Sequence, residues 1–365
     1  MLSSLFPALA VRIVLSAVTS FVLALIIGPR VIDALKERQI GQTIREEGVQ
    51  EHRKKAGIPT MGGVIFLAPA VLATLLFAGL NLYVCLGLVL CLGMAGLGMM
   101  DDLTKVIKAR SLGLTPRQKL AGQIVCGLVA AVGLRYFPGV PSELPLPAAQ
   151  GGGTLLLANS FIQVPRWGFL DLGILYLPFI TFVVVAFTNA VNLNDGLDGL
   201  AAGSVAISLV PFAIIAVVTG QAVLSRAAGV AYIPGAGELA AMGAALFGGC
   251  LGFLWYNAHP AQVFMGDTGS MGLGGAVAAL AVCTRTELLA VVIGGLFVVE
   301  ALSVVMQVSY FKWTKGQRIF RMSPIHHHFE LCGWAEEKVV TRFWIVGAAL
   351  ALAGLGLFAG RLLLG

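Results

Sequence analysis

About ten apolar stretches divide this 365-residue chain, each near the ~20 residues that a helix needs to cross a bilayer. They run roughly over residues 9–29, 61–80, 82–100, 118–137, 172–191, 199–219, 239–257, 268–283, 288–311 and 339–361. Only 12% of the residues are charged, against about 25% in soluble domains. Backbone polar groups in hydrocarbon need internal partners, so runs of this length fold as helices. The sequence therefore predicts an all-α polytopic membrane protein, with residues 1–365 as a single integral membrane domain.

The basic residues gather in loops on one side of the predicted bundle. An even number of crossings places both termini on the same side and makes the loops alternate. Eighteen of the 24 Lys and Arg residues lie in residues 30–60, 101–119 and 312–342, which share a side. The positive-inside rule makes that side cytoplasmic and places both termini outside. A net charge of +6 confined to loops indicates membrane lipid or anionic substrates as partners, and no nucleic acid.

The loops on the opposite side carry few charges. Within the longest of them, residues 141–171 contain short β-like runs such as 161–164, which predict a small hairpin on the outer face. No catalytic chemistry is expected there.

Asp101 and Asp102 follow the third apolar stretch, where it meets a basic segment. Adjacent carboxylates at the end of a membrane-length helix are expensive, which favours a functional role. Such a pair can hold Mg²⁺ together with substrate phosphate oxygens. Lys105 lies three and four residues further on, so all three side chains can share one helical face. The alternative is two ordinary acids at a solvated helix end.

The most unusual polar segment follows the fifth apolar stretch. Asn189 and Asn192 are spaced to face the same way as the helix leaves the membrane, and Asp195 and Asp198 follow in a Gly-interrupted turn. Polar groups near bilayer depth must find partners or a water-filled cavity. A turn with Asx caps explains only one or two of them. We therefore expect this segment to line a site.

Two further loops on the same side carry chemistry. Asp267, Thr268 and Ser270 sit where a helix begins, and we expect one of them to cap it. The free amides of such an end also bind phosphate. The run 326–328 consists of three histidines. Neighbouring side chains on a helix point about 100° apart, so only an irregular loop aims two of them at one ligand.

Two lysines and one helix face complete the candidates. Lys55 precedes a Gly/Pro turn that opens a helix, which suits an anionic ligand or, alternatively, anionic lipid. Lys119 can add a phosphate contact. Glu300, Ser303 and Gln307 fall on one face of the ninth stretch and should face the bundle interior.

Taken together, these motifs resemble the polyprenyl-phosphate N-acetylhexosamine-1-phosphate transferases. The matching motifs are Pro-Thr-Met-Gly-Gly at 59–63, Asp101-Asp102 with Lys105, Asn-x-x-Asn-x-x-Asp-Gly at 189–196, Phe-Met-Gly-Asp-Thr-Gly-Ser at 264–270 and the histidine triplet at 326–328. They follow the order of the family over nearly the whole chain. Relatives that transfer N-acetylglucosamine phosphate usually have an acid in place of Lys105 and lack the triplet. The chain is therefore more similar to the branch that transfers phospho-N-acetylmuramoyl-pentapeptide, although Ile58 and Asn194 replace expected threonines.

The resemblance implies a ten-helix homodimer in the bacterial cytoplasmic (inner) membrane, with a cytoplasmic active site. It implies that UDP-N-acetylmuramoyl-pentapeptide and undecaprenyl phosphate give lipid I and UMP, with Mg²⁺ as cofactor. Asp101, Asp102 and Asp267 are the implied catalytic acids, with Asp267 and Asp102 as Mg²⁺ ligands. The predicted substrate-binding residues are Lys55, Thr60, Lys105, Lys119, Asn189, Asn192, Asp195, Asp198, Phe264, Gly266, Ser270, Gln307, His326, His327 and His328.

The role of the aspartate pair stays open among a general base, a positioning or metal-binding pair, and a covalent nucleophile. The acceptor phosphate has a second pKa near ~6, whereas an ordinary aspartate near ~3.9 is a weaker base. Base catalysis therefore requires that repulsion within the pair raise one pKa. Two other functions compete: transfer of N-acetylglucosamine phosphate, and membrane transport. Most acids cluster at one membrane face rather than along a path, which favours an enzyme.

Overall fold

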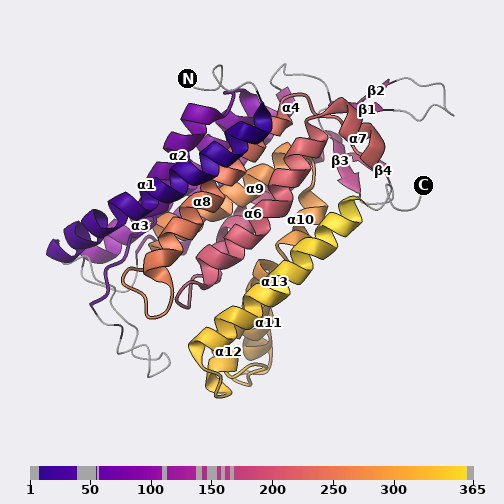
Figure 1. The fold of residues 1–365 in the computed structure, drawn as a ribbon. Coiled ribbons are helices and arrows are strands. Elements are labelled where there is room, and N and C mark those ends of the chain that lie inside the picture. Colours follow the sequence, from indigo (N-terminus) through magenta and orange to yellow (C-terminus); the bar gives the residue numbers. More distant parts are fainter. Residues whose placement is uncertain are drawn as a thin grey trace.

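The computed structural model describes residues 8–38, 55, 57–108, 113–136, 142–145, 154–157, 161–164 and 168–359. The long helices lie side by side in one bundle (Figure 1). The helices are α1 (Leu9–Glu37), α2 (Val64–Phe77), α3 (Leu82–Ile107), α4 (Pro116–Tyr136), α5 (Tyr176–Leu193), α6 (Leu200–Thr219), α7 (Ala222–Ala228), α8 (Leu239–Asn257), α9 (Gly266–Cys283), α10 (Glu287–Ile293), α11 (Gly295–Trp313), α12 (Ile325–Leu331) and α13 (Glu336–Phe358), with short 3-10 turns η4 (Gly173–Leu175) and η5 (Ala236–Glu238). The strands are β1 (Ser142–Pro145), β2 (Thr154–Leu157), β3 (Phe161–Val164) and β4 (Gly168–Asp171).

The predicted helical membrane protein is confirmed, but the count of ten crossings is not. Each of the ten predicted stretches contains helix, and eight helices of the described chain are long and apolar enough to cross a membrane. The two remaining stretches form α2, which has only 14 residues, and α9, whose glycines and Asp267 lower its hydropathy. Length and composition alone therefore do not show that α2 and α9 cross.

Helix α9 forms the centre of the bundle. Every residue from Thr268 to Cys283 is buried, and α3 and α5 pack against α9. Its glycines allow this contact, because a Cβ at Gly275 would lie 2.7 Å from the Leu90 carbonyl oxygen. Small residues are the usual means by which membrane helices approach closely. The N-terminus of α9, which carries Asp267, is thereby fixed against the C-terminal end of α3.

One predicted stretch is shortened in the structure and another is interrupted. The second stretch becomes helical only at Val64, because Met61 has a φ of 68° and the backbone before it runs alongside another loop. The ninth stretch is divided into α10 and α11 at Gly294. A Cβ at Gly294 would lie 2.8 Å from the Phe187 ring, so α5 packs into the break.

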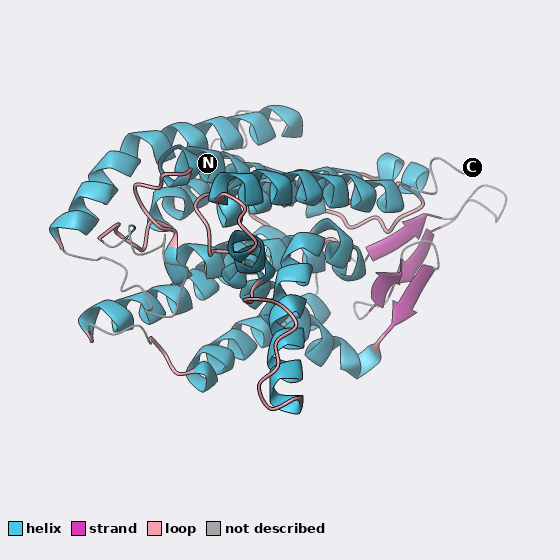
Figure 2. Ribbon diagram, turned by 90° about the horizontal axis from the view of Figure 1, so that it is seen from below, coloured by secondary structure: helices cyan, strands magenta, loops and turns pink. Residues whose placement is uncertain are grey.

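The described part of residues 141–171 forms two strand pairs instead of the single predicted hairpin. β1 pairs with β2, and β3 with β4, both antiparallel, in two separate two-stranded sheets. Figures 1 and 2 show the strands at one end of the bundle, and Figure 1 places α12 at the other end. The predicted polar loops and the strands therefore lie at opposite ends of the helices.

Candidate active site

Asp101, Asp102 and Asp267 form one cluster, called here the three-aspartate cluster. One carboxylate oxygen from each lies within 4.8 Å of the others. Asp101 and Asp102 lie within the last turns of α3 and are only 3% and 2% exposed. The alternative of two acids at a solvated helix end is therefore wrong. Burial of three carboxylates together is unfavourable unless cations balance them.

Two lysines supply that balance. Lys105 Nζ lies 2.7 Å from Asp101 Oδ2, 3.5 Å from Asp102 Oδ1 and 2.9 Å from Asp267 Oδ2. Lys119 Nζ, from the first turn of α4, lies 2.9 Å from the same Asp267 oxygen. The predicted shared face of Asp101, Asp102 and Lys105 is thus confirmed. Five formal charges meet here and leave one net negative charge.

Asp102 anchors the start of α9. Its Oδ2 accepts hydrogen bonds from the amide and the hydroxyl of Thr268, both at 2.8 Å, and its Oδ1 accepts one from the Asp267 amide at 3.2 Å. A carboxylate at a helix N-terminus pairs with free amides and with the positive end of the helix dipole. The expectation that a side chain of the helix itself caps it is wrong, because the cap comes from α3.

The two predicted asparagines have different partners. Asn192 Nδ2 donates to Asp267 Oδ1 at 2.7 Å and to Ser270 Oγ at 2.8 Å, so it belongs to the cluster. Asn189 instead exchanges hydrogen bonds with Gln123 of α4. Helix α5 packs against both α9 and α4, so two asparagines that are spaced to lie on the same face of the helix still bind different neighbours.

The loop before α2 pairs with the loop before α9. The Phe264 amide donates to the Pro59 carbonyl, and the amides of Gly62 and Gly63 donate to the carbonyls of Phe264 and Met265, at 2.8–2.9 Å. This pairing brings buried Thr60 and half-buried Phe264 beside the cluster.

Gly266 takes the conformation that this approach needs. It has a φ of +70°, and a Cβ there would lie 2.8 Å from Asp102 Oδ2 and 2.9 Å from Thr60 Oγ1. A side chain at this position would be strained and would push the Asp102 carboxylate away from α9.

Asp195 lies in the turn between α5 and α6. Partial burial of this side chain, together with the charges of neighbouring carboxylates, Asp267 first among them, raises the pKa of Asp195 to about 8. At neutral pH this side chain is therefore mostly protonated and able to donate a hydrogen bond.

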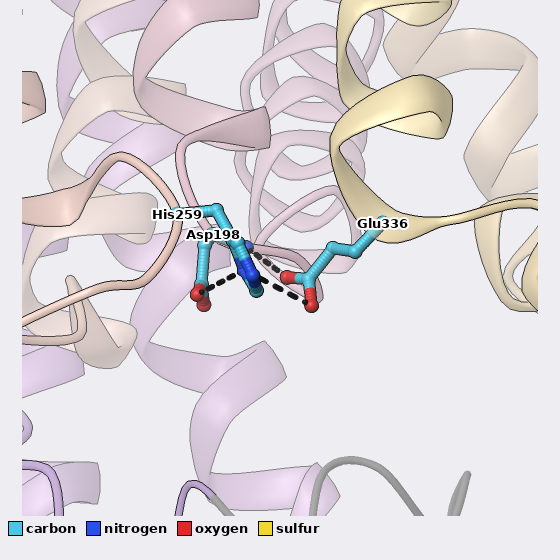
Figure 3. Close-up of side chains that lie close together, drawn as sticks. All are labelled: Asp198, His259 and Glu336. Carbon is cyan, nitrogen blue, oxygen red and sulfur yellow. Dashed lines mark hydrogen bonds and ion pairs between the residues drawn. The ribbon is translucent and has the colours of Figure 1, made fainter.

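Four residues form a second group, called here the Lys55 cluster: Lys55, Asp198, His259 and Glu336. Lys55 Nζ lies 2.7 Å from Asp198 Oδ1 and 2.6 Å from Glu336 Oε1. His259 Nδ1 lies 3.1 Å from Asp198 and 3.5 Å from Glu336. Figure 3 shows the His259 ring between the two carboxylates. The predicted residues Lys55 and Asp198 therefore meet each other.

The three histidines diverge because they lie on helix α12. His326 is fully buried and contacts Glu300, with Nδ1 3.1 Å from Oε1. His327 pairs with Glu330 at 2.7 Å, and His328 Nδ1 accepts the Arg321 amide at 3.1 Å. An irregular loop that aims two of them at one ligand is not observed, since α12 is regular.

The polar face of α11 points inward, as predicted. Glu300, Ser303 and Gln307 are 0%, 2% and 8% exposed. The side-chain oxygen Oε1 of Gln307 accepts hydrogen bonds from the backbone amides of Ile319 and Phe320. Gln307 therefore holds the loop before α12. Contact between Gln307 and substrate stays a prediction.

Gly196 sits against the buried histidine. A Cβ there would lie 2.2 Å from His326 Nε2, and Glu300 and the His327 ring hold His326 from behind. Gly196→Ala is therefore expected to shift the Asp195 turn and lower kcat about 10- to 100-fold. Gly356→Ala on α13, where a Cβ meets nothing within 4 Å, is the control. Equal kcat values in the two variants would contradict this packing argument.

Sequence reasoning missed His259 and Glu336. His259 lies in a loop already singled out, next to Asn257, whose side chain accepts the Gly199 amide at 3.0 Å. Glu336 lies in the first turn of α13, where an acid is favoured by the helix dipole alone. The signal that could have found them is their position on the basic side of the membrane.

Known proteins match nearly the whole chain. A family model described as glycosyl transferase family 4 matches residues 84–285, and a phospho-N-acetylmuramoyl-pentapeptide-transferase signature matches residues 55–67. Proteins named phospho-N-acetylmuramoyl-pentapeptide-transferase from Geobacter sp. (strain M21) and Citrifermentans bemidjiense are each 46% identical over 97% of this chain and 94% of their own length. One from Thermodesulfovibrio yellowstonii is 45% identical over 96% of this chain and 94% of its own. These matches span the three-aspartate cluster and Lys55.

Proposed function

This chain belongs to the phospho-N-acetylmuramoyl-pentapeptide-transferase family, and we propose that it carries out its reaction on the three-aspartate cluster. It transfers phospho-N-acetylmuramoyl-pentapeptide from the UDP-linked donor to undecaprenyl phosphate, which gives lipid I and UMP in peptidoglycan synthesis. Transfer of N-acetylglucosamine phosphate is not favoured, because the relatives above carry the muramoyl-pentapeptide name.

One observation carries the proposed site: a single ammonium group, that of Lys105, contacts all three carboxylates. The oxygens therefore converge on a position for positive charge. Oxygen ligands of this kind are what Mg²⁺ prefers, with one or two carboxylates completed by phosphate oxygens. The donor set fits a magnesium ion held by Asp102 and Asp267. Bound there, Mg²⁺ would supply charge neutralisation at the donor diphosphate and at the departing UMP.

The chain's own groups position and neutralise the substrates. An oxygen of the acceptor phosphate attacks the phosphorus that carries the sugar, the diphosphate P–O bond breaks, and UMP leaves with the electron pair. Such transfers depend mainly on alignment and charge. Lys105 and Lys119 bring two positive charges to the phosphate oxygens, and Asn192 fixes the orientation of the Asp267 carboxylate.

We assign the aspartate pair to positioning. Asp102 already binds the amide and hydroxyl of Thr268, and Asp101 binds Lys105 and the Leu114 amide at 2.8 Å. The acceptor phosphate is mostly ionised at neutral pH, since its second pKa is near ~6, and it needs no strong base. Isolation of a phosphosugar–enzyme adduct in rapid-quench trials would instead support a covalent route.

The proposed setting is the bacterial inner membrane, with the site on its cytoplasmic face and both termini outside. Lys55, Lys105 and Lys119, which belong to the predicted basic loops, lie in the two clusters described above, which supports this orientation. A homodimer is proposed from the family resemblance alone. Native mass spectrometry in detergent tests the dimer, and thiol labelling of single cysteines placed in the loops tests the orientation.

Removal of divalent cations is expected to lower lipid I synthesis by the purified protein at least about 100-fold, because the phosphate charges would then lose their counter-ion. The assay uses radiolabelled donor in detergent, with EDTA and with Mg²⁺ restored. A second readout is independent of turnover: Mg²⁺ should raise the melting temperature of the wild type, and should do so less in Asp267→Asn.

Three results would contradict these proposals. Full activity in EDTA would exclude the cofactor. Product from UDP-N-acetylglucosamine alone would change the substrate. Flux of the donor across vesicle membranes without formation of lipid-linked product would favour the transporter alternative.

A further inference from the structure

The Lys55 cluster joins four segments that are distant in sequence. Lys55 precedes α2, Asp198 lies between α5 and α6, His259 follows α8, and Glu336 opens α13. Asp198 Oδ2 also accepts the Ala261 amide at 3.0 Å. The group therefore fixes the relative positions of these four segments, and Figure 3 shows the side chains of Asp198, His259 and Glu336 from three of them.

Glu336 contacts each of the other three residues of the Lys55 cluster. Its Oε1 accepts Lys55 Nζ at 2.6 Å and the Asp198 amide at 2.8 Å, and its Oε2 accepts Lys55 Nζ at 2.8 Å. The residue is 9% exposed. A helix-dipole role alone would leave the carboxylate at its own amides, whereas here both oxygens bind other segments.

We propose that Glu336 is a positioning residue for the transfer, which holds Lys55 and the Asp198 turn in the arrangement that binds the UDP-linked donor. This inference rests on the proposed function and on the prediction that Lys55 binds substrate, which it narrows to the UDP-linked donor. A lysine has a long flexible stem, and fixing it costs side-chain entropy. Two carboxylates on one ammonium fix that stem before the donor arrives, so the donor gains affinity.

The Lys55 ammonium occupies the position in which a cation would balance the carboxylates of this group. Asp198, His259 and Glu336 have the spacing of a possible cation site. The Lys55 ammonium, however, already lies 2.6–2.8 Å from both carboxylates and balances one of their two charges.

The neighbouring acid on α13 supplies a matched control. The side chain of Glu337 is 59% exposed, and its contact with the cluster is to His259 Nε2 at 3.3 Å. Glu337→Gln makes the same chemical change one residue away, on the solvent side of the helix.

A double-mutant cycle tests the proposal. Wild type, Glu336→Gln, Lys55→Ala and the double variant are compared in detergent for kcat and for KM of each substrate. We expect Glu336→Gln to raise the donor KM about five- to tenfold, with kcat and the lipid KM within about twofold. The double variant should be no worse than Lys55→Ala, because Glu336 acts through the lysine. Glu337→Gln should match the wild type.

The other outcomes are distinguishable. Effects that multiply in the double variant, or a fall in kcat alone, would overturn the positioning role. An unchanged donor KM in Lys55→Ala would overturn both that role and donor binding by Lys55. A wild type that makes no lipid I would overturn the proposed function itself. Should Glu336→Gln melt below the assay temperature, Glu336→Asp, with its shortened side chain, replaces it and is expected to raise the donor KM likewise.

Discussion

Asp267→Asn is expected to lower lipid I synthesis at least about 1,000-fold, because loss of one preorganised charge-stabilising group costs about 100- to 1,000-fold in rate and the proposed Mg²⁺ ligand is lost with it. The carboxylate of Asp267 forms ion pairs with Lys105 and Lys119 and accepts a hydrogen bond from the side-chain amide of Asn192. An asparagine has the same shape but turns one acceptor into a donor and removes the charge. The two ammonium groups would then repel each other with less compensation, and the proposed Mg²⁺ ligand would be lost. The measurement is single-turnover formation of lipid I from radiolabelled donor.

The control for Asp267→Asn is Asp33→Asn, an exposed acid near the end of α1 that makes the same change in net charge. It should keep the activity of the wild type. Melting temperature and gel filtration show whether Asp267→Asn is folded. A folded Asp267→Asn with more than about a tenth of wild-type activity would contradict the proposed role, because charge removal at a metal-bearing carboxylate costs far more.

Much of the site could be predicted because membrane topology limits where loops can meet. Once the apolar stretches are recognised, alternate loops must share a side, and the polar residues at 101–105, 189–198 and 264–270 fall together. Local spacing also predicted that Asp101, Asp102 and Lys105 share a helical face, and the contacts of Lys105 confirm this. These inferences need only the length of a helix and its period.

The rest of the site depends on pairings between segments that are distant in sequence, and local sequence patterns do not predict such pairings. The backbone pairing of 59–63 with 264–265 shortens α2, although the sequence there reads as a continuous apolar run. The separation of Asn189 from the cluster depends on Gln123, which attracted no attention in the sequence. Glu336 resembled any acid in a first helical turn, and only its contacts with Lys55 and the Asp198 amide distinguish it.

Gly98→Ala is expected to disable the enzyme although it adds only a methyl group and changes no charged or polar side chain. A Cβ at Gly98 would lie 2.1 Å from the carbonyl oxygen of Asp267 and 2.8 Å from the Thr268 amide nitrogen. These are backbone atoms, so no side-chain rotation relieves the contact, and α9 must move away from α3. Asp102 then loses its hydrogen bonds to the N-terminus of α9. Because displacements near 1 Å can cost about 100-fold in rate, we expect at least that loss in kcat.

Gly96→Ala separates this effect from helix propensity. It lies two residues away on the same helix, and a Cβ there meets nothing within 4 Å. Alanine in place of glycine stabilises a helix interior by about 1 kcal/mol, so Gly96→Ala should melt no lower than the wild type and keep its activity. Gly98→Ala gains the same propensity, yet it should melt lower, because the contact between α3 and α9 is forced apart. The decisive comparison is activity per folded molecule for the two variants. Equal activity would show that α9 can shift without disturbing Asp102 and Asp267, and the three-aspartate cluster would then not depend on the close approach of the two helices.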